Sequence, residues 1–422
     1  MTVEILKIAA LMYTTLCLSV ATFNIIRQNL KSIYFVYIIF YALFILPMLF
    51  DLTYGLPEYK KYPGLMLSRD DSFANIIYIA FLCFIASLWL VYARRHKSHL
   101  GFSLPSFSII LSYCQYTIII MPALLLIVFP NSLSQTDYDL VVAGELESTT
   151  STVVNILTFL SIFAIILIFL TQRNSYFSLI SLVPWSILSI WLNGKRNKVL
   201  ISIMGLAASL IYKKLIRGNK MVIVGFVLVF AFIGYSDIYQ VSVRAIDSNA
   251  TSPEDGYAGK RIDYGINSVT KLAIYAELHP NQVKILEYRG QRAVFTILPF
   301  ISKSTWPGKP LPYALYVTSA IFFAAPQLWG YGITTSILEE GISNFSWIGM
   351  VLAPLLILVL CIYDDRPGDL ILSMSTVLVA SLLLAVQIVS FYPIIVAYLI
   401  YLIYKNRYVS VGSLKMDYTN ET

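Results

Sequence analysis

Residues 73–93 read FANIIYIAFLCFIASLWLVYA, and this stretch decides the fold class. It holds 21 residues without a charged side chain, and Arg94, Arg95 and Lys97 follow directly after it. A helix needs about 20 consecutive, mostly apolar residues to cross the hydrocarbon core of a bilayer. The apolar residues follow one another without the alternation that is typical of a half-buried strand, so the stretch predicts a transmembrane helix.

The composition of the whole chain agrees with this stretch. Of the 422 residues, 58% are hydrophobic and 13% are charged, and the mean hydropathy is +0.74. Soluble domains carry about 25% charged residues, and half of that is too little to cover a soluble surface of this size. A soluble enzyme, a disordered chain and a disulfide scaffold are therefore excluded. The net charge of +7 is ascribed to cytoplasmic loops, where Lys and Arg collect, so no nucleic-acid partner is predicted.

Apolar runs of similar length predict an all-α, polytopic integral membrane bundle with about eleven transmembrane helices and one large outer loop. Spanning strands are excluded because they must close into barrels, whose hydropathy signal is much weaker. The predicted spans are 5–23, 33–50, 73–93, 105–129, 153–171, 175–192, 197–213, 220–239, 345–363, 370–386 and 388–404.

One long hydrophilic segment divides the chain. The predicted parts are an N-terminal bundle of about eight helices at 1–239, a large loop at 240–344, C-terminal helices at 345–404 and a tail at 405–422. Long ordered loops often carry function, so this loop is expected to hold short helices of its own. Its apolar runs at 293–301 and 313–325 are too short to span comfortably and are expected to be interfacial or re-entrant.

Charge asymmetry predicts the orientation of the chain. Basic residues such as Arg94, Arg95 and Lys213 fall in one set of alternate loops, whereas the loop at 131–152 is acidic and has no Lys or Arg. The positive-inside rule then places the N-terminus and the loop at 240–344 outside, and the C-terminus in the cytoplasm.

The turn Asn193-Gly194-Lys195-Arg196-Asn197-Lys198 is basic, although helix parity places it outside. It lies where a helix begins, and the free N–H groups and positive dipole end of a helix N-terminus attract anions. The planar fork of an arginine also matches phosphate oxygens. Lys195 and Arg196 are therefore candidate ligands for a lipid diphosphate. The alternative, for each Lys in particular, is a cation that snorkels to the lipid interface.

Further cations lie in the long loop. Arg289 and Arg292 are three residues apart and would share a face of a helix, and Lys303 and Lys309 follow them. An apolar run comes directly after the two arginines, so they are expected to face the membrane surface. All four residues are candidate diphosphate ligands, whereas an ordinary solvated surface is the simpler interpretation for most other charges of the loop.

A carboxylate precedes the span at 345–363. Glu340 could accept a proton from a sugar hydroxyl as a general base. It could equally be a surface glutamate favoured by the helix dipole, or pair with a loop arginine and hold the loop shut. Glu339 is expected to point about 100° away and to serve as a control. Asp263 and His279 are reserve bases. Metal-ligating residue types never occur at a workable spacing, so neither a metal nor a cofactor is predicted.

Taken in order, these pieces resemble the Wzy-type oligosaccharide repeat-unit polymerases, relatives of the O-antigen ligases. The matching pieces are Gly194-Lys195-Arg196, Tyr288-Arg289-Gly290, the stretch 300–310 with its Trp306-Pro307, and Glu340 with Asn344-Phe345. The chain departs from the family pattern at two positions. Lys303 stands where the family often has Arg, and Ser346 stands where it often has Gly.

The resemblance implies a bacterial inner-membrane glycosyltransferase with a GT-C-like fold. It implies polymerisation of undecaprenyl-diphosphate-linked oligosaccharide units into O-antigen or a similar surface polysaccharide at the periplasmic face. Membrane lipids and a chain-length regulator are the further partners it suggests. In such a reaction, fixed cations stabilise the leaving diphosphate and a carboxylate or histidine takes the proton of the acceptor hydroxyl.

Two other functions stay open. An O-antigen ligase shares the donor but transfers the glycan to a lipid A core. A polysaccharide flippase or transporter is expected to have repeated halves and a charged central cavity, and the sequence shows neither.

Overall fold

The computed structural model describes residues 2–95, 109–128, 148–171, 182–189, 205–225, 227, 234, 257, 261, 265–297, 301, 305–328, 332–365, 369–392 and 394–405. Across these ranges the chain is helical and contains no β-strand. Large apolar side chains are exposed along the helices, among them Ile5, Met12 and Leu16 near the N-terminus. Lipid is the suitable solvent for such a surface. The protein is an all-α membrane protein, as the sequence predicts.

Four helical segments of the described part are long and apolar enough to cross a membrane. They are Val3–Ile26 within α1 (Thr2–Ile26), Ser32–Tyr54, α5 (Ser72–Arg95) and α16 (Ile337–Asp364). They coincide with the spans predicted at 5–23, 33–50, 73–93 and 345–363.

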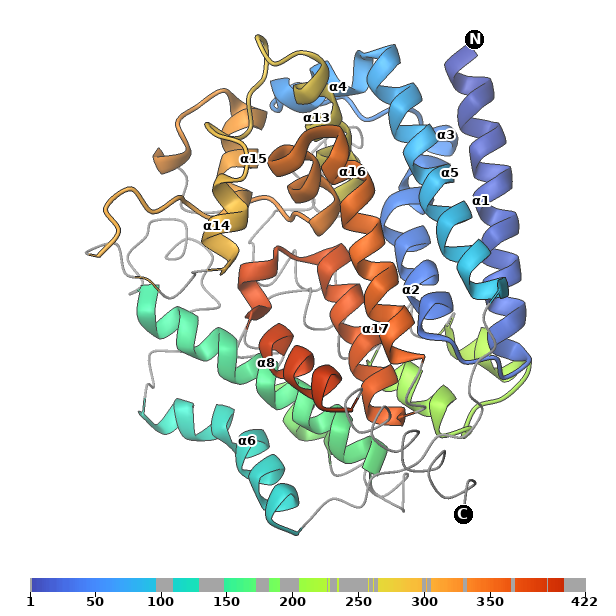
Figure 1. Cartoon of the computed structure of the whole chain (residues 1–422), viewed down its shortest axis with the longest axis vertical. Helices are drawn as coiled ribbons and strands as arrows, with labels where there is room; N and C mark the ends of the chain where they lie inside the picture. Colours follow the sequence, from blue (N-terminus) through green and yellow to red (C-terminus); the bar gives the residue numbers. More distant parts are fainter. Residues whose placement is uncertain are drawn as a thin grey trace, which may run out of the picture.

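The segment Ser32–Tyr54 is built from three pieces: α2 (Ser32–Phe40), a π-helical turn η1 (Tyr41–Ile45) and α3 (Leu46–Tyr54). Pro47 follows the π-helical turn. A proline lacks an N–H group and its ring crowds the carbonyl four residues earlier, so the wider turn accommodates the ring without ending the helix. Packing of α1, α2 and α5 against one another forms the first layer of the bundle (Figure 1).

α16 changes direction at Ser346, where φ is 56° and ψ is −142°. The residues before this kink fold back on those after it so closely that a Cβ at Gly349 would collide with the carbonyl oxygen of Gly341. Glycine at both positions permits this approach. Glu339 and Glu340 therefore lie before the kink, and the apolar part after it coincides with the predicted span.

α17 (Leu370–Ala385) lies at the centre of the bundle, and all of its residues are buried. It packs against α16 and α2. Asp364, at the end of α16, accepts a hydrogen bond from Ser373 Oγ at 3.0 Å and another from Ser32. These bonds satisfy a buried carboxylate and join α16 to α17 and α2.

Other predicted spans are helical in part. α6 (Ile109–Val128) and α8 (Ser148–Thr171) pack against each other, as Figure 1 shows, where spans at 105–129 and 153–171 are predicted. After α17, a 3-10 turn η4 (Ile388–Phe391) precedes the apolar helix Ile394–Lys405. The spans at 175–192, 197–213 and 220–239 lie partly outside the described residues. The number of eleven spans, the GT-C-like fold and the four-part division of the chain therefore stay predictions.

The long loop predicted at 240–344 contains helices, as expected. Its described part holds α13 (Ile266–Leu278), α14 (Gln291–Ile297), α15 (Tyr313–Phe322) and a 3-10 turn η3 (Pro326–Leu328). Together with α4 (Pro63–Asp70) they gather at the end of the bundle where the N-terminus lies, at the top of Figure 1. α14 and α15 correspond to the two apolar runs, and both are too short to span a bilayer. The bacterial inner membrane and the orientation of the termini stay predictions.

Candidate functional site

The structure describes five of the predicted site residues: His279, Arg289, Arg292, Lys309 and Glu340. Lys195, Arg196, Asp263 and Lys303 lie outside the described residues, and so does the basic turn at 193–198. Of the five, Arg292 and Glu340 come together at the end of the bundle formed by α13, α14 and α15. They define the candidate site.

Asn344 positions the two elements of this site. Its Oδ1 accepts hydrogen bonds from the backbone N–H groups of Arg292 at 3.0 Å and Ala293 at 3.3 Å, so it caps the start of α14. Its Nδ2 donates to the Glu340 carbonyl at 2.7 Å, and its own carbonyl accepts from Gly290 N–H at 3.0 Å. Gly290 has φ 76°, a conformation that glycine adopts without strain, and turns the chain into α14. One buried amide thus ties α14 to α16.

Arg292 is buried, yet its donors are only partly used. Its Nη1 donates to the Leu311 carbonyl at 3.0 Å, and its guanidinium carbon lies 4.1 Å from the centroid of the Phe295 ring. Nε and Nη2 have no hydrogen-bond partner among the residues that the structure describes. Burial lowers the pKa of Arg292, while the negative charge of Glu340 acts in the opposite direction.

Glu340 faces Arg292 without a hydrogen bond between them. Its Oε1 lies 3.8 Å from Arg292 Nη2, and the other oxygen, Oε2, is buried without a partner in the described part of the chain. Buried polar groups are normally satisfied, and those left unsatisfied in a folded protein indicate a functional role or stored strain. A positive and a negative group with unused hydrogen-bonding atoms therefore face each other. The arrangement also fits the alternative in which Glu340 pairs with a loop arginine.

Lys309 brings a second cation to the same aromatic ring. Its Nζ lies 4.9 Å from the Phe295 centroid and donates to the Ile301 carbonyl at 2.7 Å. The stretch Trp306–Lys309 is a turn closed by a hydrogen bond of 2.9 Å from Lys309 N–H to the Trp306 carbonyl. The two cations Arg292 and Lys309 thus flank Phe295.

Arg289 does not share a face with Arg292, contrary to the expectation from their spacing. It precedes Gly290 and lies outside α14, with 61% of its side chain exposed. Its Nη2 pairs with Glu277 of α13 at 2.9 Å, and Glu277 also accepts a hydrogen bond of 2.6 Å from Ser346 Oγ. The positive φ of Gly290 separates the two arginines in space. Arg289 therefore connects the loop to α13 and to the kink of α16.

Glu339 is unsuited as the control for Glu340 that the sequence suggested. It is fully buried and forms a capping box with Ser336, whose backbone N–H and hydroxyl both donate to its carboxylate. Thr270 of α13 donates to it as well, at 3.1 Å. The expected 100° separation from Glu340 required a helical segment, and α16 is helical here, but the expectation did not include the burial of Glu339 against Thr270 of α13. The pattern Ser336-Ile337-Leu338-Glu339 is a capping-box signature that could have been recognised in the sequence.

His279 directly follows α13 and pairs with Asp71, which lies far from it in the chain. Its Nε2 is 3.0 Å from Asp71 Oδ2, at the junction of α4 and α5. Its ring also lies 4.5 Å from that of Tyr275. These contacts attach α13 to the helical bundle, and the role of His279 as a reserve base stays a prediction.

Comparison of the chain with models of protein families, with curated proteins and with solved structures finds no match. The argument for function therefore rests on the residues of this chain and on their geometry.

Proposed function

We propose that the protein is a membrane glycosyltransferase that polymerises undecaprenyl-diphosphate-linked oligosaccharide units at the periplasmic face of a bacterial inner membrane. One observation carries the proposal. Arg292, a candidate diphosphate ligand, and Glu340, the candidate base, lie 3.8 Å apart, and each has buried hydrogen-bonding atoms without a partner in the ranges that the structure describes. The sequence pieces that resemble the Wzy-type polymerases include Glu340, and Arg292 lies two residues after the piece Tyr288-Arg289-Gly290.

The proposed reaction needs the two charges in different roles. The acceptor hydroxyl oxygen forms a bond to the anomeric carbon of the donor, and the bond from that carbon to the diphosphate oxygen breaks. Glu340 takes the hydroxyl proton through its free Oε2, which a general base requires. The leaving diphosphate keeps the electron pair of the broken bond, and preorganised cations stabilise its charge.

Two of the cations in this part of the chain suit the leaving group. Arg292 has Nε and Nη2 available, and the planar fork that they form matches two oxygens of one phosphate. Lys309 also lies near the Phe295 ring. A lysine is a point charge, so it can pair with differently placed phosphate oxygens. Lys195, Arg196 and Lys303 are further proposed diphosphate ligands, with the resemblance as their support.

The decisive experiment uses purified full-length protein and lipid-linked repeat units as the only substrate. Polymer on a gel supports a polymerase. Absence of polymer together with transfer to an added lipid A core would indicate a ligase, and movement of the unit across a vesicle bilayer without a covalent product would indicate a flippase.

Glu340→Gln tests the base in the same assay. Gln keeps the shape but cannot take the proton, so the rate is expected to fall by about 10²–10⁴-fold. Glu287→Gln is the matched control, because Glu287 is an exposed carboxylate of the same loop. Near wild-type polymerisation by Glu340→Gln would reject Glu340 as the base. An equal loss of thermal stability and activity would favour the alternative in which the pair only holds the loop shut.

A further inference from the structure

The direction of the Arg292 side chain is fixed by a backbone carbonyl. Its Nη1 donates to the Leu311 carbonyl at 3.0 Å, whereas Glu340 Oε1 lies 3.8 Å from Nη2, beyond hydrogen-bond distance. The guanidinium carbon also lies 4.1 Å from the centroid of the Phe295 ring. A guanidinium is rigid and planar, so these two contacts set where Nε and Nη2 point. The Leu311 carbonyl therefore helps to direct the two donors that have no partner among the described residues.

Leu311 is itself held in place. It stands between Pro310 and Pro312, directly before α15. A proline has no N–H group, so Leu311 carries the one backbone donor of this tripeptide, and a residue that precedes a proline is restricted to extended conformations. The Leu311 N–H group donates to the Tyr316 hydroxyl oxygen at 3.3 Å. Tyr316 is thus connected to Arg292 through a short, stiff segment of backbone.

Tyr316 also holds the start of α14. The Nε2 group of Gln291, the first residue of α14, donates to Tyr316 Oη at 2.7 Å. A hydroxyl oxygen has two lone pairs, and the bonds from Gln291 and Leu311 use both. Tyr316 is buried, so the loss of this oxygen would leave two donors without an acceptor. One hydroxyl therefore fixes both the chain neighbour and the acceptor of Arg292.

The same face of α15 supports the segment that carries Glu340. Tyr313 lies three residues before Tyr316 and shares its face of the helix. The Tyr313 hydroxyl donates to the Glu339 carbonyl at 3.0 Å, next to Glu340 in α16. One tyrosine of α15 thus holds the segment of the carboxylate, and the other holds the segment of Arg292. α15 thereby sets the separation between the two charges.

We infer that Tyr316 is a positioning residue, which directs the Nε and Nη2 donors of Arg292 toward two oxygens of the lipid diphosphate. The inference rests on the proposed role of Arg292 as a diphosphate ligand. Tyr316 acts through Leu311 and Gln291, so it contributes to binding only while Arg292 presents its planar fork.

The test is a double-mutant cycle for the binding of undecaprenyl diphosphate, measured by native mass spectrometry on the full-length protein in a maltoside detergent. Tyr316→Phe keeps the ring and removes the acceptor, so binding is expected to weaken about tenfold. Arg292→Lys keeps the charge opposite Glu340 but loses the fork, and it is expected to weaken binding by about the same factor. In the Arg292→Lys background, Tyr316→Phe is expected to add no more than about twofold.

Two results of the cycle would overturn the inference. Unchanged binding in Tyr316→Phe is the first. The second is a loss of about a hundredfold in the double variant, the product of the single effects, which would show that Tyr316 acts independently of Arg292. The thermal midpoint of each variant confirms that it is folded. If Tyr316→Phe does not fold, Gln291→Met removes one of the two donors to Oη and provides the same cycle with a smaller perturbation.

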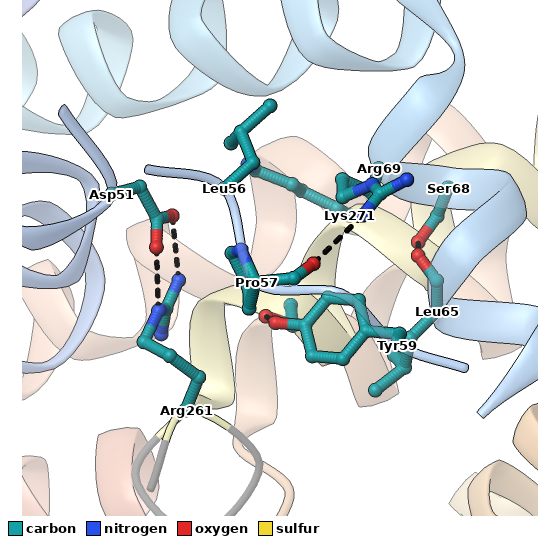
Figure 2. Close-up of a pocket in the computed structure, with 10 residues that line it drawn as sticks. Asp51, Leu56, Pro57, Tyr59, Leu65, Ser68, Arg69, Arg261 and Lys271 are labelled. Atoms are coloured by element: carbon teal, nitrogen blue, oxygen red, sulfur yellow. Dashed lines mark hydrogen bonds and ion pairs between the residues drawn. The ribbon is translucent and has the colours of Figure 1, made fainter. Parts of the chain in front are cut away.

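Tyr59→Phe is the matched control. Tyr59 is a buried tyrosine near the other buried arginine of this end of the bundle, and its hydroxyl lies 2.9 Å from Ser268 Oγ. Figure 2 shows Tyr59 together with the two hydrogen bonds by which Asp51 already satisfies Arg261. The variant loses a buried hydrogen bond of a tyrosine hydroxyl, yet diphosphate binding is expected to stay at the wild-type level. A loss equal to that of Tyr316→Phe would assign the effect to general loosening of the fold and overturn the inference.

The binding cycle and the polymerisation assay can fail separately. Absence of polymer, together with the expected binding cycle, would reject the polymerase and still support Tyr316 as a positioning residue, because a ligase and a flippase take the same lipid diphosphate. Polymer formed by a wild-type protein that does not bind undecaprenyl diphosphate would overturn the inference and retain the proposed reaction.

Discussion

Two buried arginine–carboxylate pairs lie at the same end of the bundle, and their hydrogen bonding is opposite. Arg261 and Asp51 form two parallel hydrogen bonds of 2.7 and 2.8 Å, and Tyr257 adds a third to Asp51 at 2.8 Å. The remaining nitrogen, Nη1 of Arg261, donates to Asn267 at 3.0 Å. Arg292 and Glu340 approach only to 3.8 Å, and within the described ranges three of their hydrogen-bonding atoms have no partner.

The difference separates a structural pair from a candidate site. Burying a charge is costly unless good geometry and further hydrogen bonds compensate for the lost water. Arg261 and Asp51 meet this condition, and their hydrogen bonds hold Arg261 against the end of α3. Arg292 and Glu340 do not meet it, because three of their hydrogen-bonding atoms have no partner among the described residues. A bound substrate could complete their hydrogen bonding.

The largest expected effect is the loss of stability when the complete pair is broken. Asp51→Asn leaves the Arg261 charge buried without a counter-ion, which typically costs about 3–5 kcal/mol. Thermal unfolding of the detergent-solubilised protein measures this as a lower midpoint. Asp70→Asn, at the exposed pair with Arg69, is the control and should change stability by at most about 1 kcal/mol. If Glu340→Gln lowers the thermal midpoint as much as Asp51→Asn does, the two pairs do not differ in their contribution to stability.

An intermediate effect is expected from Asn344→Ala. The substitution leaves the backbone N–H groups of Arg292 and Ala293 without their acceptor, and a buried unsatisfied group costs about 1–3 kcal/mol. Because Asn344 positions α14, polymerisation should fall further than the stability change alone explains. Wild-type activity at a lowered thermal midpoint would show that the placement of Arg292 is unimportant.

The smallest effect on stability is expected from Arg289→Ala. Its ion pair with Glu277 is largely exposed on the arginine side, and such pairs contribute at most about 1 kcal/mol. Loss of polymerisation in this variant, with an unchanged thermal midpoint, would make Arg289 a substrate ligand as the resemblance suggests. A matched loss in Ser346→Ala, which removes the other hydrogen bond to Glu277, would instead assign both residues to the kink of α16.

The sequence predicted the helices better than the site. Apolar runs locate spanning helices because hydropathy acts over some twenty residues, and the segments at 5–23, 33–50 and 73–93 are helical as expected. The separation of Arg289 from Arg292 depends on one backbone angle at Gly290, which spacing does not reveal. The ion pair of Asp51 with Arg261 was missed because the two residues lie 210 positions apart in the chain. The kink at Ser346 was not predicted either, because it depends on the positive φ of a single residue that is not glycine.

The fold-back of α16 at Ser346 has a consequence for biogenesis. The part after the kink, 347–364, is about 27 Å long at 1.5 Å per residue, which approaches the thickness of the hydrocarbon core. A straight helix would instead draw Glu339 and Glu340 toward the insertion machinery together with this segment, and a charge near the centre of an inserting helix costs about 2.5–3.5 kcal/mol. Because of the kink, the segment that inserts carries one acidic residue, Asp364 at its end, and excludes Glu339 and Glu340. Substitutions at Gly341 or Gly349 that straighten it should therefore appear first as less protein in the membrane, before any change in turnover.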